Sequence, residues 1–268
     1  MKPVVVSAAA ALILLGAPVA SRPAPAASPF DGLWVDDLKT QMGEAGFDTY
    51  LVANGVYTCK SCRPPRSYPA DGKMRPVPGD LSVLSESATV TGPRTLLTRL
   101  VDHEMARETT MTVAPDGTSA TYVSLDAWPG RTRRLGTEYR ATRVASAPPG
   151  AHAVSGSWRG VANVAFPEEY RSVTLHEAAG LFTRSNFRHG RYTARINGAP
   201  APVTDDGKNI YQATVRAPNP HTRVEMILLQ GKPVVKRTYT LSPDSCALTT
   251  IVSSAGGEEP FSTVAHRK

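Results

Sequence analysis

The chain has 268 residues, with 30 Lys and Arg against 23 Asp and Glu, which gives a formal net charge of +7. Its 23 prolines are scattered along the sequence and exclude a protein built from long helices, because proline disrupts the hydrogen bonding of a helix interior. A net positive charge is a general surface property, and by itself it indicates no particular partner.

The first residues have the layout of a secretory signal peptide. A short positive start is followed by an uncharged apolar run from Val4 to Leu15 and then by small residues, with candidate cleavage sites between Ala20 and Ala27. The apolar run is too short for a transmembrane helix, which needs roughly 20 apolar residues. No cysteine precedes Cys59, so the leader lacks the residue that carries the lipid in a lipoprotein. We therefore expect residues 1–27 to be a signal peptide and Pro/Ala-rich leader, and the protein to be exported, periplasmic or secreted, with no transmembrane segment after cleavage.

The rest of the chain contains the same pattern twice. Phe30-Asp31-Gly32-Leu33-Trp34 is matched 124 positions later by Val154-Ser155-Gly156-Ser157-Trp158. Both copies also end on an arginine, Arg143 in the first and Arg267 in the second, again 124 positions apart. These matches indicate a tandem duplication.

The duplication predicts two domains, residues 28–145 and residues 153–268. A domain of this length can bury roughly two-thirds of its unfolded surface, which is enough for a core without a metal. Between them, residues 146–152 hold two adjacent prolines and no large apolar residue, and this composition predicts a short, stiff linker.

Most of both copies alternates between outward and inward residues, as half-buried strands do. The alternation is clear from Ala120 to Leu125 and from Val235 to Leu241, and a weak exception from Val35 to Met42 is typical of a helix or a loop. Many short strands with frequent turns predict an all-β fold, an antiparallel sandwich or barrel. Dipeptides that favour tight hairpin turns separate the strands at Asn54-Gly55, Asp71-Gly72, Asp116-Gly117, Asn197-Gly198 and Asp206-Gly207.

Each half resembles a lipocalin-like (calycin) unit, in which a Gly-x-Trp enters the first strand and an arginine lies on the last strand. The resemblance implies a tandem duplication of two antiparallel, up-and-down lipocalin-like β-barrels or sandwiches. It also implies that each tryptophan closes one end of its barrel beneath the late arginine, a cation–π contact worth about 0.5–2 kcal/mol. On this resemblance the barrel-plug residues are Gly32, Trp34 and Arg143 in the first half, and Gly156, Trp158 and Arg267 in the second.

The whole chain after the leader also resembles a group of uncharacterised secreted bacterial proteins with two such repeats. The resemblance rests on the segment from Asn54 to Pro65, which reads NGVYTCKSCRPP, followed by Ala70-Asp71-Gly72-Lys73. It implies a shape and does not imply an activity.

Cys59 and Cys62 have the spacing Cys-x-x-Cys, and in an oxidising compartment we expect them to form a small disulfide in a turn. A redox or metal site and a pair of free thiols are the alternatives. A redox role would need the first cysteine at a helix N-terminus, and a zinc site would need further ligands. In the duplication Cys59 aligns with Arg184 and Cys62 with Phe187, so the fold should not depend on the disulfide. Cys246 stands alone and is expected to be a small, semi-buried side chain.

The sequence contains no catalytic motif that we can identify. It has no Gly-x-Ser-x-Gly, no His-Glu-x-x-His and no phosphate-binding glycine loop, and we predict no catalytic residue, metal or cofactor. His176 alternates with Val173 and Leu175, so it is expected to face solvent or the barrel lumen. A catalyst assembled from distant strands would carry no local motif, so an enzyme stays an alternative.

Basic residues are dense between Arg184 and Arg191. Without Lys2 and Arg22 of the leader, 28 basic residues remain against 23 acidic ones, so a basic patch of this kind could bind an anionic surface. Nucleic acid is disfavoured because the protein is expected to be exported. The candidate ligand-binding residues are Arg184, Arg188, Arg191 and His176.

These features together predict an exported, non-enzymatic β-barrel protein that binds a small apolar or amphipathic ligand or an anionic envelope component. Small barrels either fill their interior with side chains or hold one ligand. Two alternatives stay open. One is an envelope-acting enzyme with a site at the interface between the two halves, and the other is a purely structural or interaction protein.

Overall fold

The computed structural model describes residues 27–42, 47–80, 83–130, 132–188, 190–204, 210–254 and 260–268. The expected signal peptide, within residues 1–26, and the expected turn at Asp206-Gly207 lie outside these residues. Among the described residues, no helix is long and apolar enough to cross a membrane.

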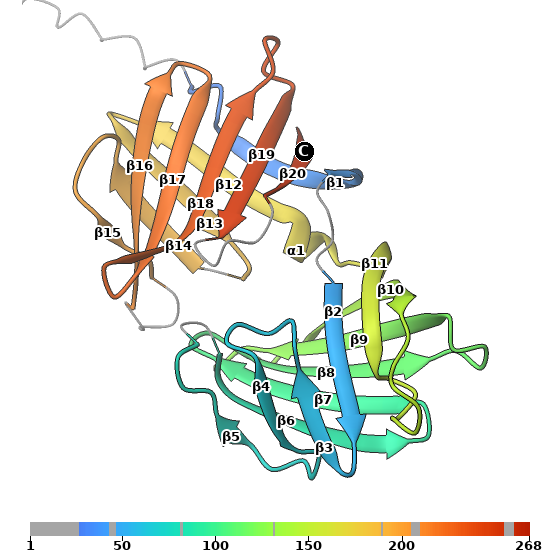
Figure 1. Cartoon of the computed structure of the whole chain (residues 1–268). Helices are drawn as coiled ribbons and strands as arrows, with labels where there is room; N and C mark the ends of the chain where they lie inside the picture. The colour runs from blue at the N-terminus through green and yellow to red at the C-terminus, as the bar shows by residue number, and fades with distance from the viewer. Residues whose placement is uncertain are drawn as a thin grey trace, which may run out of the picture.

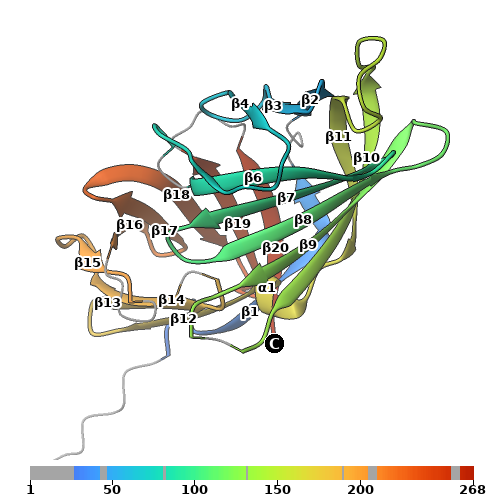
Figure 2. The ribbon, with the colours of Figure 1, turned by 90° about the horizontal axis from the view of Figure 1, so that it is seen from below.

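The protein is all-β and consists of two curled, antiparallel, ten-stranded sheets, as predicted (Figures 1 and 2). We call the first sheet the N-terminal barrel. It contains β2 (Phe47–Ala53), β3 (Val56–Cys59), β4 (Arg66–Pro69), β5 (Arg75–Pro76), β6 (Val83–Gly92), β7 (Thr95–Asp102), β8 (Ala106–Val113), β9 (Ser119–Ala127), β10 (Leu135–Ala145) and β11 (Gly156–Ala165).

The second sheet, which we call the C-terminal barrel, combines the first strand of the chain with its last nine. It contains β1 (Gly32–Met42), β12 (Ser172–Ala178), β13 (Leu181–Asn186), β14 (Gly190–Arg195), β15 (Ala201–Pro202), β16 (Tyr211–Asn219), β17 (Thr222–Leu229), β18 (Lys232–Leu241), β19 (Ala247–Ser254) and β20 (Phe261–Arg267). A single turn of helix, α1 (Glu168–Arg171), precedes β12.

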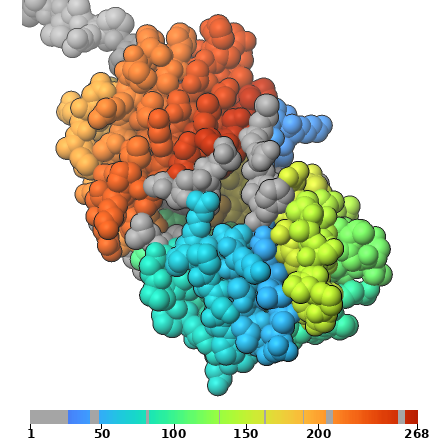
Figure 3. Space-filling view, in the orientation of Figure 1, coloured from blue at the N-terminus to red at the C-terminus, as the bar shows by residue number. Residues whose placement is uncertain are grey.

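The two repeats exchange their first strands. Strand β1 lies between β12 and β20, and strand β11 lies between β2 and β10. In Figure 3 the blue atoms of β1 accordingly lie beside the red C-terminal barrel. The division therefore differs from the expected domains at residues 28–145 and 153–268. The N-terminal barrel is the continuous segment 47–165, and the C-terminal barrel joins residues 32–42 to residues 172–267.

The expected linker at residues 146–152 is a hairpin connection within the N-terminal barrel, because it joins β10 directly to its neighbour β11. It packs on that barrel: the His152 amide donates to the Val52 carbonyl at 2.8 Å, and the His152 ring lies 2.8 Å from the Gly92 carbonyl oxygen. The chain passes between the two sheets elsewhere, between β1 and β2 and again through α1.

The sequence predictions were correct where residues adjacent in the chain determine the structure, as in a tight turn or an alternating strand. Asn54 and Gly55 have φ values of 51° and 72° and form the tight turn between β2 and β3, as expected. The helix or loop expected from Val35 to Met42 was wrong, since this segment is the second part of β1. Its pairing with β20, from Val35 opposite His266 onward, overrides the weak local preference.

Each barrel has one apolar core, and a third cluster lies where the two barrels meet. The third cluster consists of Met105, Trp128 and Leu135 of the N-terminal barrel with Tyr170 of α1 and Phe187 that follows β13. Trp128 contacts the Phe187 ring edge-on at a centroid distance of 4.9 Å. The two curled sheets are therefore joined by packed aromatic rings as well as by the chain.

Candidate functional site

Trp158, the expected plug of one barrel end, is buried in the core of the N-terminal barrel. The ring is buried, and its Nε1 donates to the Val154 carbonyl at 2.9 Å. The guanidinium of Arg143 lies 4.1 Å from the ring centroid and donates to the carbonyls of Ala153 and Gly117, both at 2.6 Å. With a further hydrogen bond to the Ser155 carbonyl, each of the three guanidinium nitrogens of Arg143 donates to a backbone carbonyl around the tryptophan.

Trp34, the expected plug of the other barrel, is buried in the core of the C-terminal barrel and has equivalent contacts. Its Nε1 donates to the Phe30 carbonyl at 2.9 Å, and Arg267 lies over the ring at 4.8 Å while donating to the Pro29 carbonyl at 2.6 Å. Each tryptophan thus lies beneath an arginine, but Arg267 covers Trp34 and Arg143 covers Trp158. This corrects the expected grouping of Trp34 with Arg143 and of Trp158 with Arg267, because the strand that carries each tryptophan lies in the other repeat's barrel.

The glycines of the two plugs permit the close approach of the chain. Gly32 and Gly156 have φ values of 136° and 124°, which side chains rarely adopt. A Cβ on Gly156 would lie 2.5 Å from the Ala145 carbonyl oxygen. The Gly-x-Trp pattern is therefore a requirement of the plug geometry.

The two residues before each glycine make contacts with the barrel that contains the strand following them. Phe30 lies under the guanidinium of Arg223 at 4.4 Å, and Arg223 forms two hydrogen bonds to Glu177, at 2.7 and 2.8 Å. Asp31 accepts from the Glu177 amide at 2.6 Å. In the other plug the smaller pair Val154 and Ser155 occupies these places, and Ser155 Oγ accepts from the Val52 amide at 2.9 Å.

Above its plug, the interior of the N-terminal barrel is lined by tyrosine rings. Tyr122 and Tyr139 stack with centroids 4.5 Å apart, and Tyr57 lies 5.9 Å from Tyr50 and 5.3 Å from Tyr68. Burial raises the pKa of each of these hydroxyls, so all are neutral donors at ordinary pH.

A carboxylate lies among these rings. Asp48 is opposite Trp158 in the β2–β11 register, so it points to the interior as the tryptophan does. Burial raises its pKa, and a hydrogen bond from the Tyr50 hydroxyl opposes that rise. No described Lys, Arg or His forms an ion pair with Asp48. The Tyr122 hydroxyl, buried nearby, has no hydrogen-bond partner among the described residues.

Both barrels hold buried paired charges: Arg66 pairs with Glu86 in the N-terminal barrel, and a larger cluster surrounds Glu225 in the C-terminal barrel. Glu225 is fully buried; it accepts from the Tyr239 hydroxyl at 2.6 Å and from Arg237 at 3.2 Å. Arg184 donates to the Tyr239 hydroxyl at 3.0 Å and lies 3.8 Å from Glu225. Burial alone would raise the pKa of Glu225, but Arg237 and Arg184 hold it below the usual value.

Two further groups extend this interior. The Tyr192 hydroxyl is buried without a hydrogen-bond partner among the described residues, and Tyr192 lies opposite Arg184 in the β13–β14 register and in the same core cluster as Tyr239. Asp36 of β1 has its pKa raised by burial to about 6, against the opposing charge of Arg171 and Arg184.

The four predicted ligand-binding residues do not form one site. Arg184 points into the C-terminal barrel and is almost fully buried, whereas Arg191 is exposed on the outer face of β14. Arg188 lies between the barrels, 5.6 Å from the Tyr170 ring centroid, and burial lowers its pKa. His176 is exposed on β12, with Nδ1 3.2 Å from Asp31. The expected basic patch is therefore divided between an interior, a junction and a surface.

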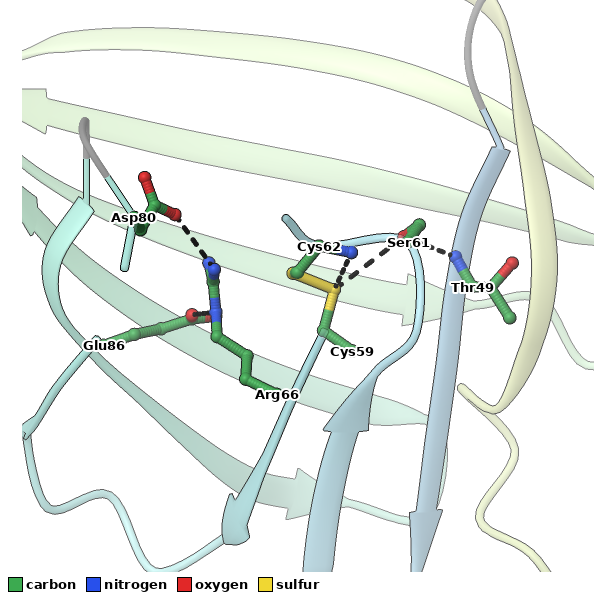
Figure 4. Close-up of a disulfide and its surroundings, with 7 residues drawn as sticks. All are labelled: Thr49, Cys59, Ser61, Cys62, Arg66, Asp80 and Glu86. Atoms are coloured by element: carbon green, nitrogen blue, oxygen red, sulfur yellow. Dashed lines mark hydrogen bonds and ion pairs between the residues drawn. A yellow bond between two sulfur atoms is a disulfide. The ribbon is translucent and has the colours of Figure 1, made fainter. Parts of the chain in front are cut away.

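Cys59 and Cys62 form the expected disulfide (Figure 4). Cys59 is buried in the core of the N-terminal barrel, and Arg184 has the equivalent place in the C-terminal barrel, since they lie opposite Tyr50 and Leu175 in matching registers. Figure 4 also shows Arg66 beside the disulfide, where it pairs with Asp80 and Glu86 at 3.0 and 2.5 Å. Cys246 is exposed and not semi-buried as expected, because it follows the turn at Asp244.

The junction between the barrels is held by a shared carboxylate. Asp126 receives two hydrogen bonds from Arg107, both at 2.6 Å, and a third from the Tyr170 hydroxyl of α1 at 2.5 Å. Strand β9 runs from the turn that contacts Arg143 to Asp126, so this contact lies at the end of the barrel away from the plug. The unplugged end of the N-terminal barrel therefore meets the C-terminal barrel.

No group of three or more His, Cys, Asp or Glu residues that could hold a metal ion occurs in the part of the chain that the structure describes. In comparisons with known proteins, no family model, no curated protein and no solved structure matches this chain.

The interior residues of the N-terminal barrel were missed by sequence reasoning. Asp48, Tyr50 and Val52 alternate along β2 and share one face, and Tyr122 lies on a predicted strand, so the alternation was a usable signal. The alternation does not show which strands lie opposite each other. It therefore could not predict that these side chains face one interior.

Proposed function

We propose that this chain is an exported, lipocalin-like protein that binds a small amphipathic molecule in the interior of its barrels. The observation that carries the proposal is that the Tyr122 and Tyr192 hydroxyls, one in each barrel, are buried without a hydrogen-bond partner among the described residues. A buried hydroxyl left unpaired costs roughly 1–3 kcal/mol, and most buried polar groups in proteins are paired.

The surroundings of these hydroxyls support an amphipathic ligand. Tyr122 is stacked on Tyr139, and Tyr192 belongs to the apolar core of the C-terminal barrel that also contains Phe182. Ligand sites are mostly apolar, with a few polar groups that fix orientation. An apolar body with one polar group would pack on the rings and give each hydroxyl a partner.

Export is supported by two independent features. Residues 1–27 have the layout of a signal peptide and leader. The Cys59–Cys62 disulfide fits an oxidising compartment, where such bonds persist.

The test is native mass spectrometry on the protein purified from an exporting host. We expect a retained adduct of small mass that is lost on denaturation. Replacing Tyr122 or Tyr192 with phenylalanine, which removes only the hydroxyl, would locate the adduct in one barrel. A bare mass, together with no change in melting temperature across a panel of anionic, neutral and cationic amphiphiles, would contradict the proposal.

A further inference from the structure

The interiors of the two barrels differ in charge at equivalent positions. Asp48 lies opposite Trp158 in the N-terminal barrel, and Val173 lies opposite Trp34 in the C-terminal barrel. The C-terminal interior instead contains Arg184 and Arg237 around Glu225. Beside its Arg66–Glu86 pair, the N-terminal interior thus carries a carboxylate, Asp48, that has no ion-pair partner among the described residues. The C-terminal interior carries two guanidinium groups around Glu225.

The core that Asp48 faces is rich in aromatic rings, and none of the described cations pairs with this carboxylate. Tyr50 lies on the same inner face of β2 as Asp48, and Tyr57, Tyr122 and Tyr139 belong to the same interior cluster. Three arginines act on these hydroxyls and all are already engaged; the first, Arg66, pairs with Asp80 and Glu86. Arg143 donates to plug carbonyls, and Arg107 is bound through two hydrogen bonds to Asp126.

We propose that the interior of the N-terminal barrel binds a small organic cation, with its ammonium group held by Asp48 and by the surrounding tyrosine rings. This inference rests on the proposed function and names the ligand class for one of the two barrels. Tyrosine faces attract ammonium and methylated ammonium groups through the ring quadrupole, and a desolvated site strengthens that attraction.

The chemistry selects against the other ligand classes. A buried carboxylate without a cation is costly, so a bound ammonium group stabilises its ionised form. An anionic ligand would place a second negative charge beside Asp48, and a neutral ligand would leave the carboxylate unpaired. The unpartnered Tyr122 hydroxyl can accept from a primary ammonium or donate to an oxygen elsewhere on the same ligand.

The test compares choline with 3,3-dimethylbutan-1-ol, which has the same shape but a carbon atom in place of the charged nitrogen. Isothermal titration is performed on the full exported chain, on Asp48→Asn, on Asp48→Glu and on Glu138→Gln. Glu138 lies on β10 opposite the exposed Val123, so its replacement removes a carboxylate from the outside of the same barrel. Circular dichroism first establishes that each variant is folded.

We expect the unmodified chain to bind choline at least tenfold more tightly than the neutral probe. Asp48→Asn should remove this preference, and Asp48→Glu should keep most of it, as should Glu138→Gln. Equal binding of the two probes, or a preference that persists in Asp48→Asn, overturns the cation inference and leaves the proposed function standing. Binding of neither probe also overturns it, while the adduct and amphiphile experiments decide the proposed function separately.

Discussion

Arg267 lies 4.8 Å from the ring centroid of Trp34, although the two residues are at opposite ends of the described chain. The contact exists because β1 lies next to β20, and it joins the first strand to the last. The C-terminal barrel is therefore complete only when residues 32–42 pack against a segment that begins at residue 172. The N-terminal barrel has no such dependence, because its strands form the continuous segment 47–165.

Replacing the two plug tryptophans should affect opposite barrels. Trp34→Ala should destabilise the C-terminal barrel and Trp158→Ala the N-terminal barrel, each by about 3–5 kcal/mol, the usual cost of truncating a buried tryptophan. Hydrogen exchange followed by mass spectrometry, which resolves the two barrels, measures the effect. Loss of protection in residues 47–145 on replacing Trp34 would contradict the strand exchange, and a change below about 1 kcal/mol would contradict the plug role.

Cysteine cross-linking tests the position of β1 directly. Val35 lies opposite His266 in the β1–β20 register, so the double variant Val35→Cys, His266→Cys should form a disulfide under mild oxidation. The matched control is Val35→Cys with Thr142→Cys, which pairs the same position with the equivalent residue of the first repeat. It should remain reduced.

Both cross-linking variants are made in a Cys246→Ser background, because Cys246 is an exposed free thiol. After a protease has cleaved the chain between the two barrels, non-reducing electrophoresis shows whether an intramolecular disulfide still links the fragments. A cross-link in the Thr142 variant and none in the His266 variant would reverse the assignment of β1.

Removal of the disulfide should affect only one barrel. Cys59→Ser with Cys62→Ser should leave the fold intact and lower the stability of the N-terminal barrel by about 2 kcal/mol, as expected for a short closed loop. The reason is that Arg184 and Phe187 align with the two cysteines in the other repeat, where the same fold forms without a disulfide. Urea unfolding with and without reductant measures the change, and global unfolding would show that the bond is essential.

The charge of Asp36 should make the C-terminal barrel less stable as pH rises. Burial raises the folded-state pKa of Asp36 from 3.8 to about 6, so the folded protein holds this proton more tightly than the unfolded chain. The stability that this group contributes is present below pH 4 and is lost as pH rises to about 6.

Asp36→Asn should therefore be more stable than the unmodified chain at pH 7, by up to about 3 kcal/mol, and nearly equal to it at pH 4. Urea unfolding at the two pH values measures the difference, and Asp37→Asn, at the next position of β1, is the control for the loss of one charge. A stability difference that does not change between pH 4 and pH 7 would contradict the burial of an ionised Asp36.

Glu225 should be the most sensitive charged residue of the C-terminal barrel. Glu225→Ala leaves Arg184 and Arg237 buried without their carboxylate, and breaking such a buried pair typically costs about 3–5 kcal/mol. Thermal unfolding measures the loss. Glu177→Ala, which removes the carboxylate paired with Arg223 closer to the plug, provides a comparison within the same barrel.

The sequence by itself determined the all-β class and the duplication, although it missed the strand from Val35 to Met42. Alternating residues predicted the strands, and Asn54-Gly55 predicted a hairpin turn, because these features depend on neighbours in the chain. The disulfide between Cys59 and Cys62 was likewise a local prediction. Gly32 with Trp34 and Gly156 with Trp158 marked the two plugs, because a close chain approach beside a large ring needs these residue types.

Only the tertiary structure decided which barrel each first strand completes. Because Gly-x-Trp occurs in both repeats, the local sequences of β1 and β11 do not indicate which barrel each strand joins. The choice depends on contacts between residues far apart in the chain, such as Phe30 with Arg223 and Ser155 with Val52. The same physical reason hid the carboxylate and tyrosine rings of the N-terminal barrel, since Asp48 and Tyr122 face a common interior only when the sheet curls.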